Sequence, residues 1–210
     1  MQNEFFQYGE KEIAWLKSRD KALAAAIDEI GHISRPVMPD IFTALMHSIV
    51  GQQISARAVI TVWGRILERF SPITAGNIGK ISAEELQACG ISMRKAEYIK
   101  EMTDMILQGK VDLKQIETLP DDEVVKKLIE IKGIGVWTAE MLMTFSMQRP
   151  NVISYGDLAI IRGMRMLYHH RKITPALFMK YKRRYSPYAT VASLYLWEIA
   201  GGAQVHSSKA

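Results

Sequence analysis

The sequence contains few of the residues that build disulfides, metal clusters or membrane anchors. Among its 210 residues there is one cysteine, Cys89. A single cysteine excludes an internal disulfide and a four-cysteine iron–sulfur cluster. No apolar run approaches the roughly 18 residues of a membrane helix, and residues 1–9 lack a signal-peptide pattern. We therefore expect a cytoplasmic protein with no membrane partner.

Acidic residues are missing from one long segment. Residues 158–197 contain no Asp or Glu. The net charge of the chain is +5 and this segment carries eight Lys and Arg, so the remainder sums to 5 − 8 = −3. Such a distribution is typical of a surface that contacts nucleic-acid phosphates, although solvated helix faces show it too. The eight cations are Arg162, Arg165, Arg171, Lys172, Lys180, Lys182, Arg183 and Arg184.

Strand-like alternation is missing as well. A capping box at Ser82, Pro120 before acidic residues, and Thr174 before Pro175 are helix start signals. With 48% hydrophobic residues the chain can bury a sizeable core, so the sequence predicts an all-α protein. Apolar residues recur at helical spacing in residues 10–30, 40–50, 55–70, 93–107, 121–131, 137–147, 158–168 and 187–200, with breaks at 34–39, 71–80, 108–110 and 149–156.

Two glycines flank one apolar residue between two of these helices. The stretch is Ile131-Lys-Gly-Ile-Gly-Val-Trp-Thr-Ala139. Gly133 and Gly135 indicate a tight turn whose backbone can approach a ligand. The N–H groups that follow open the second helix, where its dipole favours a phosphate. The same pattern also occurs where one helix simply ends and a short connection leads to the next.

Residues 131–139 resemble the helix-hairpin-helix of the HhH-GPD DNA glycosylase superfamily. The resemblance runs from about residue 40 to 200. It implies a two-lobed helical fold with the active site in the cleft between the lobes. Its parts are an N-terminal helix in 1–39 that packs with the C-terminal lobe, a central helical barrel in 40–150 ending in the hairpin, and a C-terminal lobe in 151–210 with the catalytic aspartate. Further matching segments, in the order of the family, are Gly51-Gln-Gln-Ile-Ser55, Cys89-Gly-Ile-Ser-Met-Arg-Lys-Ala-Glu97, Gly156-Asp157 and Ser186-Pro-Tyr-Ala-Thr-Val-Ala-Ser-Leu-Tyr-Leu-Trp197.

Within the superfamily the sequence is most similar to alkylpurine glycosylases of the 3-methyladenine DNA glycosylase II type. Bifunctional members place a lysine where Trp137 stands, and its amine forms a Schiff base with the sugar. An indole has no such nucleophile. The resemblance therefore implies a monofunctional hydrolase that removes bases of the 3-methyladenine or 7-methylguanine type from damaged double-stranded DNA and leaves an abasic site. We expect no metal or cofactor in catalysis, and the resemblance leaves open a structural monovalent cation at the hairpin. The oligomeric state is open as well, and a monomer suits an enzyme that must wrap bent DNA.

Asp157 falls where the family carries its essential aspartate. A Gly-Asp pair before apolar residues is also a good helix N-cap. The two roles are compatible, because the dipole and amide donors of a helix N-terminus favour a carboxylate. As the C1′–N bond breaks, a fixed carboxylate would stabilise the positive charge on the sugar and orient or deprotonate the attacking water.

The resemblance implies an aromatic pocket for the flipped base. Aromatic faces suit a cationic alkylated purine through stacking and cation–π attraction. Trp137, Trp197 and Tyr155 are the candidates, and core packing is the alternative for both tryptophans. Met141 stands where the compared enzyme has an aromatic residue, which predicts a wider or less selective pocket.

The implied DNA contacts come from the hairpin and from one loop. Gln53 matches the wedge, the side chain that fills the hole left by a flipped base. Its alternative role is a loop glutamine that satisfies a helix N-terminus. The hairpin candidates are Gly133, Ile134, Gly135, Val136 and Thr138, with Lys132 as a phosphate contact or a solvated charge.

Two further functions stay open from the sequence. One is a non-catalytic DNA-binding module built on the same hairpin, which would bind DNA in a salt-dependent way and release no base. The other is a glycosylase for deaminated or mispaired bases, to which Met141 gives room. A bifunctional lyase is disfavoured by Trp137.

Overall fold

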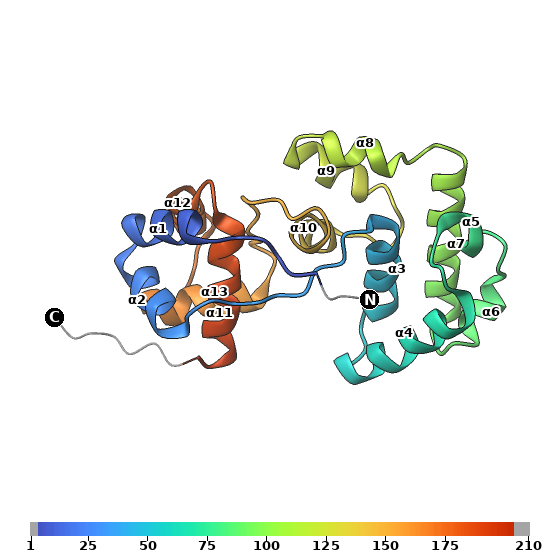
Figure 1. Ribbon diagram of the computed structural model, residues 1–210, viewed down its shortest axis with the longest axis horizontal. Coiled ribbons are helices and arrows are strands. Elements are labelled where there is room, and N and C mark those ends of the chain that lie inside the picture. The colour runs from blue at the N-terminus through green and yellow to red at the C-terminus, as the bar shows by residue number, and fades with distance from the viewer. Residues whose placement is uncertain (1–3, 204–210) are drawn as a thin grey trace. The chain divides into compact units, whose positions relative to one another are not determined.

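The computed structural model describes residues 4–203. Within this range every regular element is a helix, and thirteen helices, α1 to α13, follow one another along the chain (Figure 1). The prediction of an all-α protein is confirmed. None of the helices in residues 4–203 is both long enough and apolar enough to cross a membrane.

The helices form two compact units. The terminal unit consists of the chain up to Val37 and from Gln148 onward, and the central unit is Met38–Met147. The boundaries expected from the sequence lay after residues 39 and 150. Each unit has its own buried apolar residues.

The central unit is built around α3 (Ile41–Gly51). Asp40 begins this helix, since its carboxylate accepts a hydrogen bond from the Thr43 N–H at 2.7 Å. Most of α3 is apolar and buried, and α4, α7 and α10 pack against it. The other helices of the unit are α4 (Ala56–Phe70), α5 (Ala75–Ile78), α6 (Ala83–Gln87), α7 (Met93–Leu107), α8 (Leu113–Thr118), α9 (Asp121–Leu128) and α10 (Val136–Phe145).

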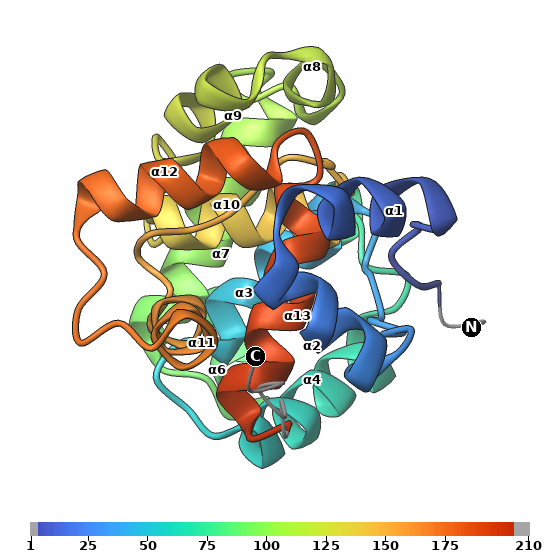
Figure 2. The same ribbon diagram turned by 90° about the vertical axis from the view of Figure 1, so that its left-hand side faces the viewer.

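The terminal unit is organised by two helices whose backbones approach closely. Figure 2 shows α11 (Leu158–Tyr168) beside α13 (Ala189–Gly201). At the crossing, a side chain on Gly163 would collide with the backbone carbonyl of Leu196. Nearly every residue of α13 is buried, which makes it the core helix of the unit. Around it lie α1 (Glu10–Arg19), α2 (Lys21–Ile30) and α12 (Pro175–Tyr185).

The helix expected over residues 10–30 is wrong in one respect, because the chain breaks at Asp20. The buried carboxylate of Asp20 accepts from the Leu23 N–H at 3.0 Å and so begins α2. It also accepts from the Tyr168 hydroxyl at 2.8 Å and from the Arg184 guanidinium at 2.7 Å. These long-range partners fix Asp20 as a cap, and helical periodicity carries no sign of them.

Short helices were also missed. The break expected at 71–80 contains α5, which is one turn long and begins at Thr74. One further turn, α8, begins where Asp112 accepts from the N–H groups of Lys114 and Gln115. Periodicity needs a longer window than a single turn provides.

Candidate nucleic-acid interface and base pocket

The hairpin between α9 and α10 turns at Gly133. Its φ of +84° is a left-handed conformation that favours glycine. A Cβ atom at this position would lie 2.6 Å from Cδ2 of Tyr98, so the ring of Tyr98 lies directly against the turn. The Gln52 side-chain amide donates to the Gly133 carbonyl at 2.6 Å. The turn is therefore held by residues from two other parts of the central unit.

Gly135 is the N-cap of α10 and provides no capping side chain. Its backbone is extended, and a Cβ atom added there would meet nothing within 4 Å. The first turn of α10 thus begins beside open space, where helix geometry directs N–H groups and the positive end of the dipole outward. Val136 and Trp137 are 52% and 49% exposed in that turn. This arrangement suits a phosphate next to an apolar sugar or base.

The remaining hairpin candidates differ in what they expose. The side chain of Ile134 is buried, so a ligand would meet only its backbone, whereas the mostly buried Thr138 still lines the cavity described below. Lys132 is exposed and its ammonium lies 2.9 Å from the Glu101 carboxylate. The hydrogen bond to Glu101 raises the pKa of Lys132. A phosphate at this side chain would have to share the lysine with Glu101.

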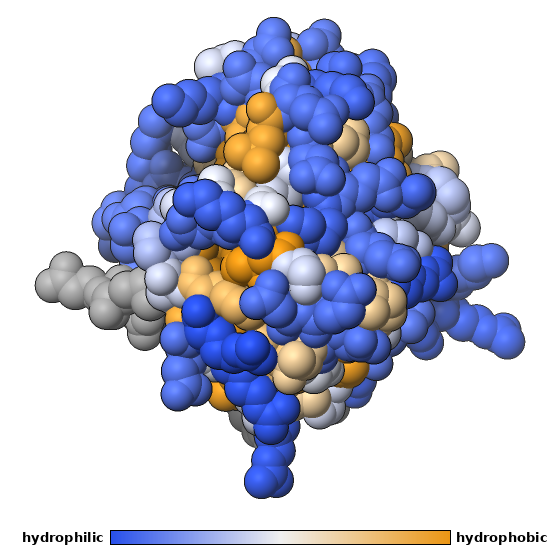
Figure 3. Space-filling model, turned by 90° about the vertical axis from the view of Figure 1, so that its right-hand side faces the viewer, coloured by the Kyte–Doolittle hydropathy of each residue, from blue (hydrophilic) through white to orange (hydrophobic). Residues whose placement is uncertain are grey.

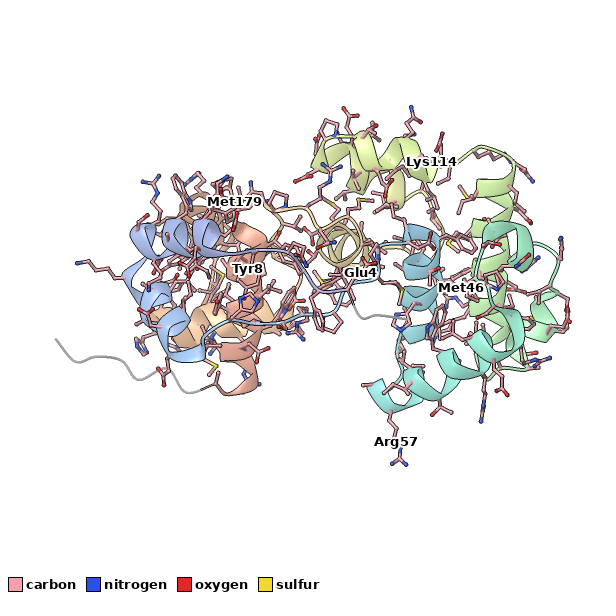
Figure 4. All side chains as sticks on the ribbon, viewed as in Figure 1. Glu4, Tyr8, Met46, Arg57, Lys114 and Met179 are labelled. Atoms are coloured by element: carbon pink, nitrogen blue, oxygen red, sulfur yellow. The ribbon has the colours of Figure 1, made fainter. Side chains whose placement is uncertain are left out.

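The loop between α3 and α4 presents Gln53. This side chain is exposed and its backbone has a φ of 57°, a left-handed conformation that is unfavourable for a residue with a side chain. The loop is held by the Lys95 ammonium, which donates to the carbonyls of Val50 at 2.8 Å and Gln52 at 2.5 Å. Burial lowers the pKa of Lys95. Just after the loop, Arg57 projects away from the ribbon at the start of α4 (Figure 4).

A cavity of about 490 Å³ lies between this loop and the start of α10. Its size is that of a small-ligand pocket. It brings together four residues that the sequence marked for DNA or base contacts, Gln53, Trp137, Thr138 and Met141. The other lining residues are His47, Ser48, Gly51, Gln52 and Val59.

His47 and its neighbours on α3 were missed by the sequence reasoning. Positions 47, 48 and 51 lie along one face of α3, which ends at Gly51 and is followed directly by Gln52 and Gln53. That pattern could have identified them. The His47 ring meets Trp63 of α4 edge-on, with 5.0 Å between centroids. Burial lowers the pKa of His47, so its imidazole is uncharged at neutral pH.

One face of the molecule is largely polar. Figure 3 looks onto the side where α5, α6 and α7 lie, and hydrophilic residues cover most of that face, with smaller apolar areas between them.

In the terminal unit, Asp157 is the N-cap of α11 and is only 7% exposed. Its Oδ1 accepts from the N–H groups of Ala159 at 2.9 Å and Ile160 at 3.0 Å. The preceding loop is tied to α13, because the Val152 N–H donates to the Thr190 hydroxyl at 2.8 Å. The carboxylate is therefore held in one orientation by backbone donors.

Trp197 and Tyr155 also lie in the terminal unit. Trp197 lines a hollow of about 390 Å³ together with Leu158 and Arg162. Leu158, directly after Asp157, is 85% exposed. The Tyr155 ring packs edge-on against Phe178 at 5.1 Å and its hydroxyl donates to the Ile173 carbonyl at 3.4 Å.

The cations of the acid-free segment, residues 158–197, have different surroundings. Arg184 is bound to the buried carboxylate of Asp20. Three arginines line one open hollow with two histidines; these are Arg162, Arg165, Arg171, His169 and His170. Within residues 4–203 no three His, Cys, Asp or Glu side chains are grouped so as to hold a metal ion.

Residues 46–187 match the family described as HhH-GPD superfamily base excision DNA repair protein, and the chain belongs to this family. The DNA-3-methyladenine glycosylase 1 of Schizosaccharomyces pombe is 32% identical over 166 residues, which cover 75% of this chain and 71% of that protein. The putative DNA-3-methyladenine glycosylase YfjP of Bacillus subtilis is 28% identical over 187 residues, which cover 84% of this chain and 64% of that protein. This chain therefore spans just under two thirds of the length of YfjP.

Solved structures agree with these matches. A DNA-3-methyladenine glycosidase from Bacillus halodurans superimposes with a TM-score of 0.85 at 34% identity, covering 95% of this chain and 93% of the other. A 3-methyladenine DNA glycosylase from Schizosaccharomyces pombe in complex with abasic DNA has a TM-score of 0.76 at 27% identity, with 90% and 96% covered. The predicted family and the likeness to 3-methyladenine glycosylases are confirmed.

Proposed function

We propose that this protein is a monofunctional DNA glycosylase of base excision repair that hydrolyses the N-glycosidic bond of alkylated purines. One observation carries the proposal: the exposed Trp137, in the first turn after the hairpin, lines a cavity of small-ligand size that contains no carboxylate. An aromatic face attracts a cationic ring. The names of the relatives above point to the same substrate class.

Backbone donors of the hairpin would bind the DNA backbone. Phosphate contacts of this kind position a protein on DNA and carry no sequence information. Gln53, exposed in the loop between α3 and α4, would fill the space of the flipped nucleotide. Both features belong to the central unit.

Asp157 of the terminal unit would supply the chemistry. Its carboxylate, oriented by two N–H donors, would stabilise positive charge on the sugar as the base leaves and would orient the attacking water. An N3- or N7-alkylated purine is already cationic and leaves as a neutral base, so the leaving group needs no general acid. The proposal thus uses no metal or cofactor, and we propose that the protein acts as a monomer in the cytoplasm.

The absence of lyase activity is part of the proposal. Trp137 has no amine for a Schiff base, and the neighbouring Lys132 is bound to Glu101. The product would be an intact strand with an abasic site. Borohydride trapping of a protein–DNA adduct would contradict this part alone.

The decisive experiment measures free bases released from methylated duplex DNA in EDTA. Wild type and Asp157→Asn are compared, with Asp40→Asn as the matched control, because Asp40 caps α3 in the same way on an exposed surface. We expect 3-methyladenine or 7-methylguanine from wild type and Asp40→Asn, none from Asp157→Asn, and strand breaks only after alkali. DNA binding without base release in the wild type would instead indicate a non-catalytic DNA-binding module or another lesion.

A second candidate function is favoured by Met141, which lines the cavity as a flexible thioether. Methionine adapts its shape to different rings. A glycosylase for deaminated or mispaired bases would release hypoxanthine or a mispaired base from duplex DNA under the same conditions and would leave methylated bases in place.

A further inference from the structure

The cavity beside the hairpin has an uneven chemical lining. Among the described residues that line the cavity, most side chains are apolar, aromatic, hydroxyl or amide groups. His47 is the only one of these lining side chains that can become charged. A histidine is also the one side chain whose ordinary pKa allows it to change charge between pH 5 and 8. The charge inside the cavity is therefore set by one residue.

Other ionisable groups near the cavity lie outside its lining. On α7, the Lys95 ammonium is bound to the carbonyls of Val50 and Gln52. On α10, Glu140 precedes the lining residue Met141 but does not line the cavity itself. On α4, Arg57 projects away from the ribbon (Figure 4).

The surroundings of His47 favour its uncharged form. The ring is packed edge-on against Trp63, and burial lowers its pKa. In neutral solution the imidazole is therefore uncharged, and it gains a proton only in acid.

This matters because the proposed substrate carries its own charge. An alkylated purine in DNA is a cation until the glycosidic bond breaks. An imidazolium in the same partly buried cavity would repel that cation, because like charges interact strongly where water is excluded. A neutral imidazole does not repel it.

We propose that His47 is the specificity-determining residue of the cavity, and that it admits a cationic purine only while its imidazole is uncharged. The inference rests on the proposed function and adds to it the side chain that discriminates between bases by their charge. It does not require His47 to take part in bond breaking.

The test compares single-turnover release of 7-methylguanine from duplex DNA by wild type, His47→Gln and His47→Lys. Glutamine is neutral at every pH, and lysine, with an ordinary pKa of about 10.4, places a cation in the cavity near neutral pH. Near neutral pH we expect His47→Lys to be about tenfold slower than His47→Gln, the equivalent of one pKa unit of charge coupling. As the pH falls below the ordinary histidine pKa of about 6.5 and through the lowered pKa of His47, the wild type should slow relative to its own rate at neutral pH, while His47→Gln should show no such fall. The titration of other groups affects both proteins equally, so it cancels in the ratio of the wild-type rate to the His47→Gln rate at each pH.

His32→Gln is the matched control, since His32 is an exposed histidine of the terminal unit that stacks on Tyr8. Its pH profile should match that of the wild type. A parallel measurement of binding to undamaged duplex should give equal affinities for all four proteins, which separates the effect on the base from an effect on DNA binding.

Equal rates for the glutamine and lysine variants, or the same acid dependence in wild type and His47→Gln, would overturn the inference while leaving the glycosylase activity standing. If His47→Lys does not fold, as judged by circular dichroism, the pH comparison of wild type with His47→Gln decides the matter. Wild-type protein that releases no methylated base at any pH would overturn the proposed function, and the inference with it.

Discussion

The first turns of α10 and α11 are the same structural element used in opposite ways. The N-cap of α10 is Gly135, which leaves the helix start without a side chain, whereas the N-cap of α11 is Asp157, whose carboxylate already accepts two N–H groups. Both starts carry exposed apolar residues, Val136 and Leu158. A helix N-terminus favours a negative charge in either case. The difference is the source of that charge: an internal carboxylate for α11 and, in the proposed function, an external phosphate for α10.

The comparison teaches how one property of a helix can serve binding in one unit and catalysis in the other. Where the cap residue has no side chain, the donors remain available to a ligand. Where the cap is an aspartate, the donors orient the carboxylate. The predictions below exchange or remove these features, from the largest expected effect to the smallest.

Replacing Asp157 by Asn or Ala separates its capping of α11 from its proposed role in catalysis. Base release should fall by at least about 100-fold in both variants, because a group that stabilises transition-state charge is lost. Asn is as good a cap as Asp, so Asp157→Asn should keep its stability, while Asp157→Ala should lose about 1 kcal/mol. Single-turnover kinetics and urea unfolding measure the two effects. Full activity in Asp157→Asn would show that the aspartate is only a cap.

Gly133→Ala should destabilise the central unit by about 1–3 kcal/mol, since it forces a side chain into a left-handed conformation. Its Cβ would also displace the Tyr98 ring. Gly135→Ala is the control: its φ of −96° and open surroundings accept a methyl group, so it should lose only the difference in capping between glycine and alanine, about 0.5–1 kcal/mol. Equal stability of the two variants would contradict the distinction between the two glycines.

Gly135→Asp converts the open start of α10 into a capped one like that of α11. The new carboxylate would occupy the anion site, and we expect affinity for duplex DNA to fall about tenfold, or 1.4 kcal/mol. The stability of the protein should rise slightly, by a few tenths of a kcal/mol. Gly135→Asn adds a neutral cap of similar size. Its affinity for duplex DNA, measured by fluorescence anisotropy, should lie between those of the wild type and Gly135→Asp. If Asp and Asn bind DNA equally, charge at this helix start does not govern binding.

The smallest effect concerns Lys132. Because the lysine is shared with Glu101 at the surface, Lys132→Gln should weaken DNA binding by only about twofold and lower the salt slope by at most about one. Glu101→Gln frees the lysine and should steepen the slope. An unchanged slope in both variants would mean that Lys132 contacts no phosphate.

Local sequence patterns predicted more of the fold than of the site. Helical periodicity gave the all-α class and most of the long helices, because an amphipathic helix repeats its signal over several turns. It failed at Asp20, where partners more than a hundred residues away along the chain interrupt the pattern. The family was recognisable from the hairpin and the Gln-Gln and Gly-Asp segments, and this recognition is confirmed.

The sequence by itself determined the positions that depend on backbone chemistry. The glycines of the hairpin are such positions, because the conformational freedom of glycine predicts a turn without reference to any side-chain partner. Asp157 is another, because it precedes an apolar helix and its capping role depends only on the nearby backbone N–H groups. Only the tertiary structure decided which side chains share a space. It placed the Tyr98 ring against Gly133, gathered Trp137, Met141 and Gln53 around one cavity, and added His47 to its lining. Helix packing brings such residues together from distant parts of the chain, and neither propensity nor periodicity records that contact.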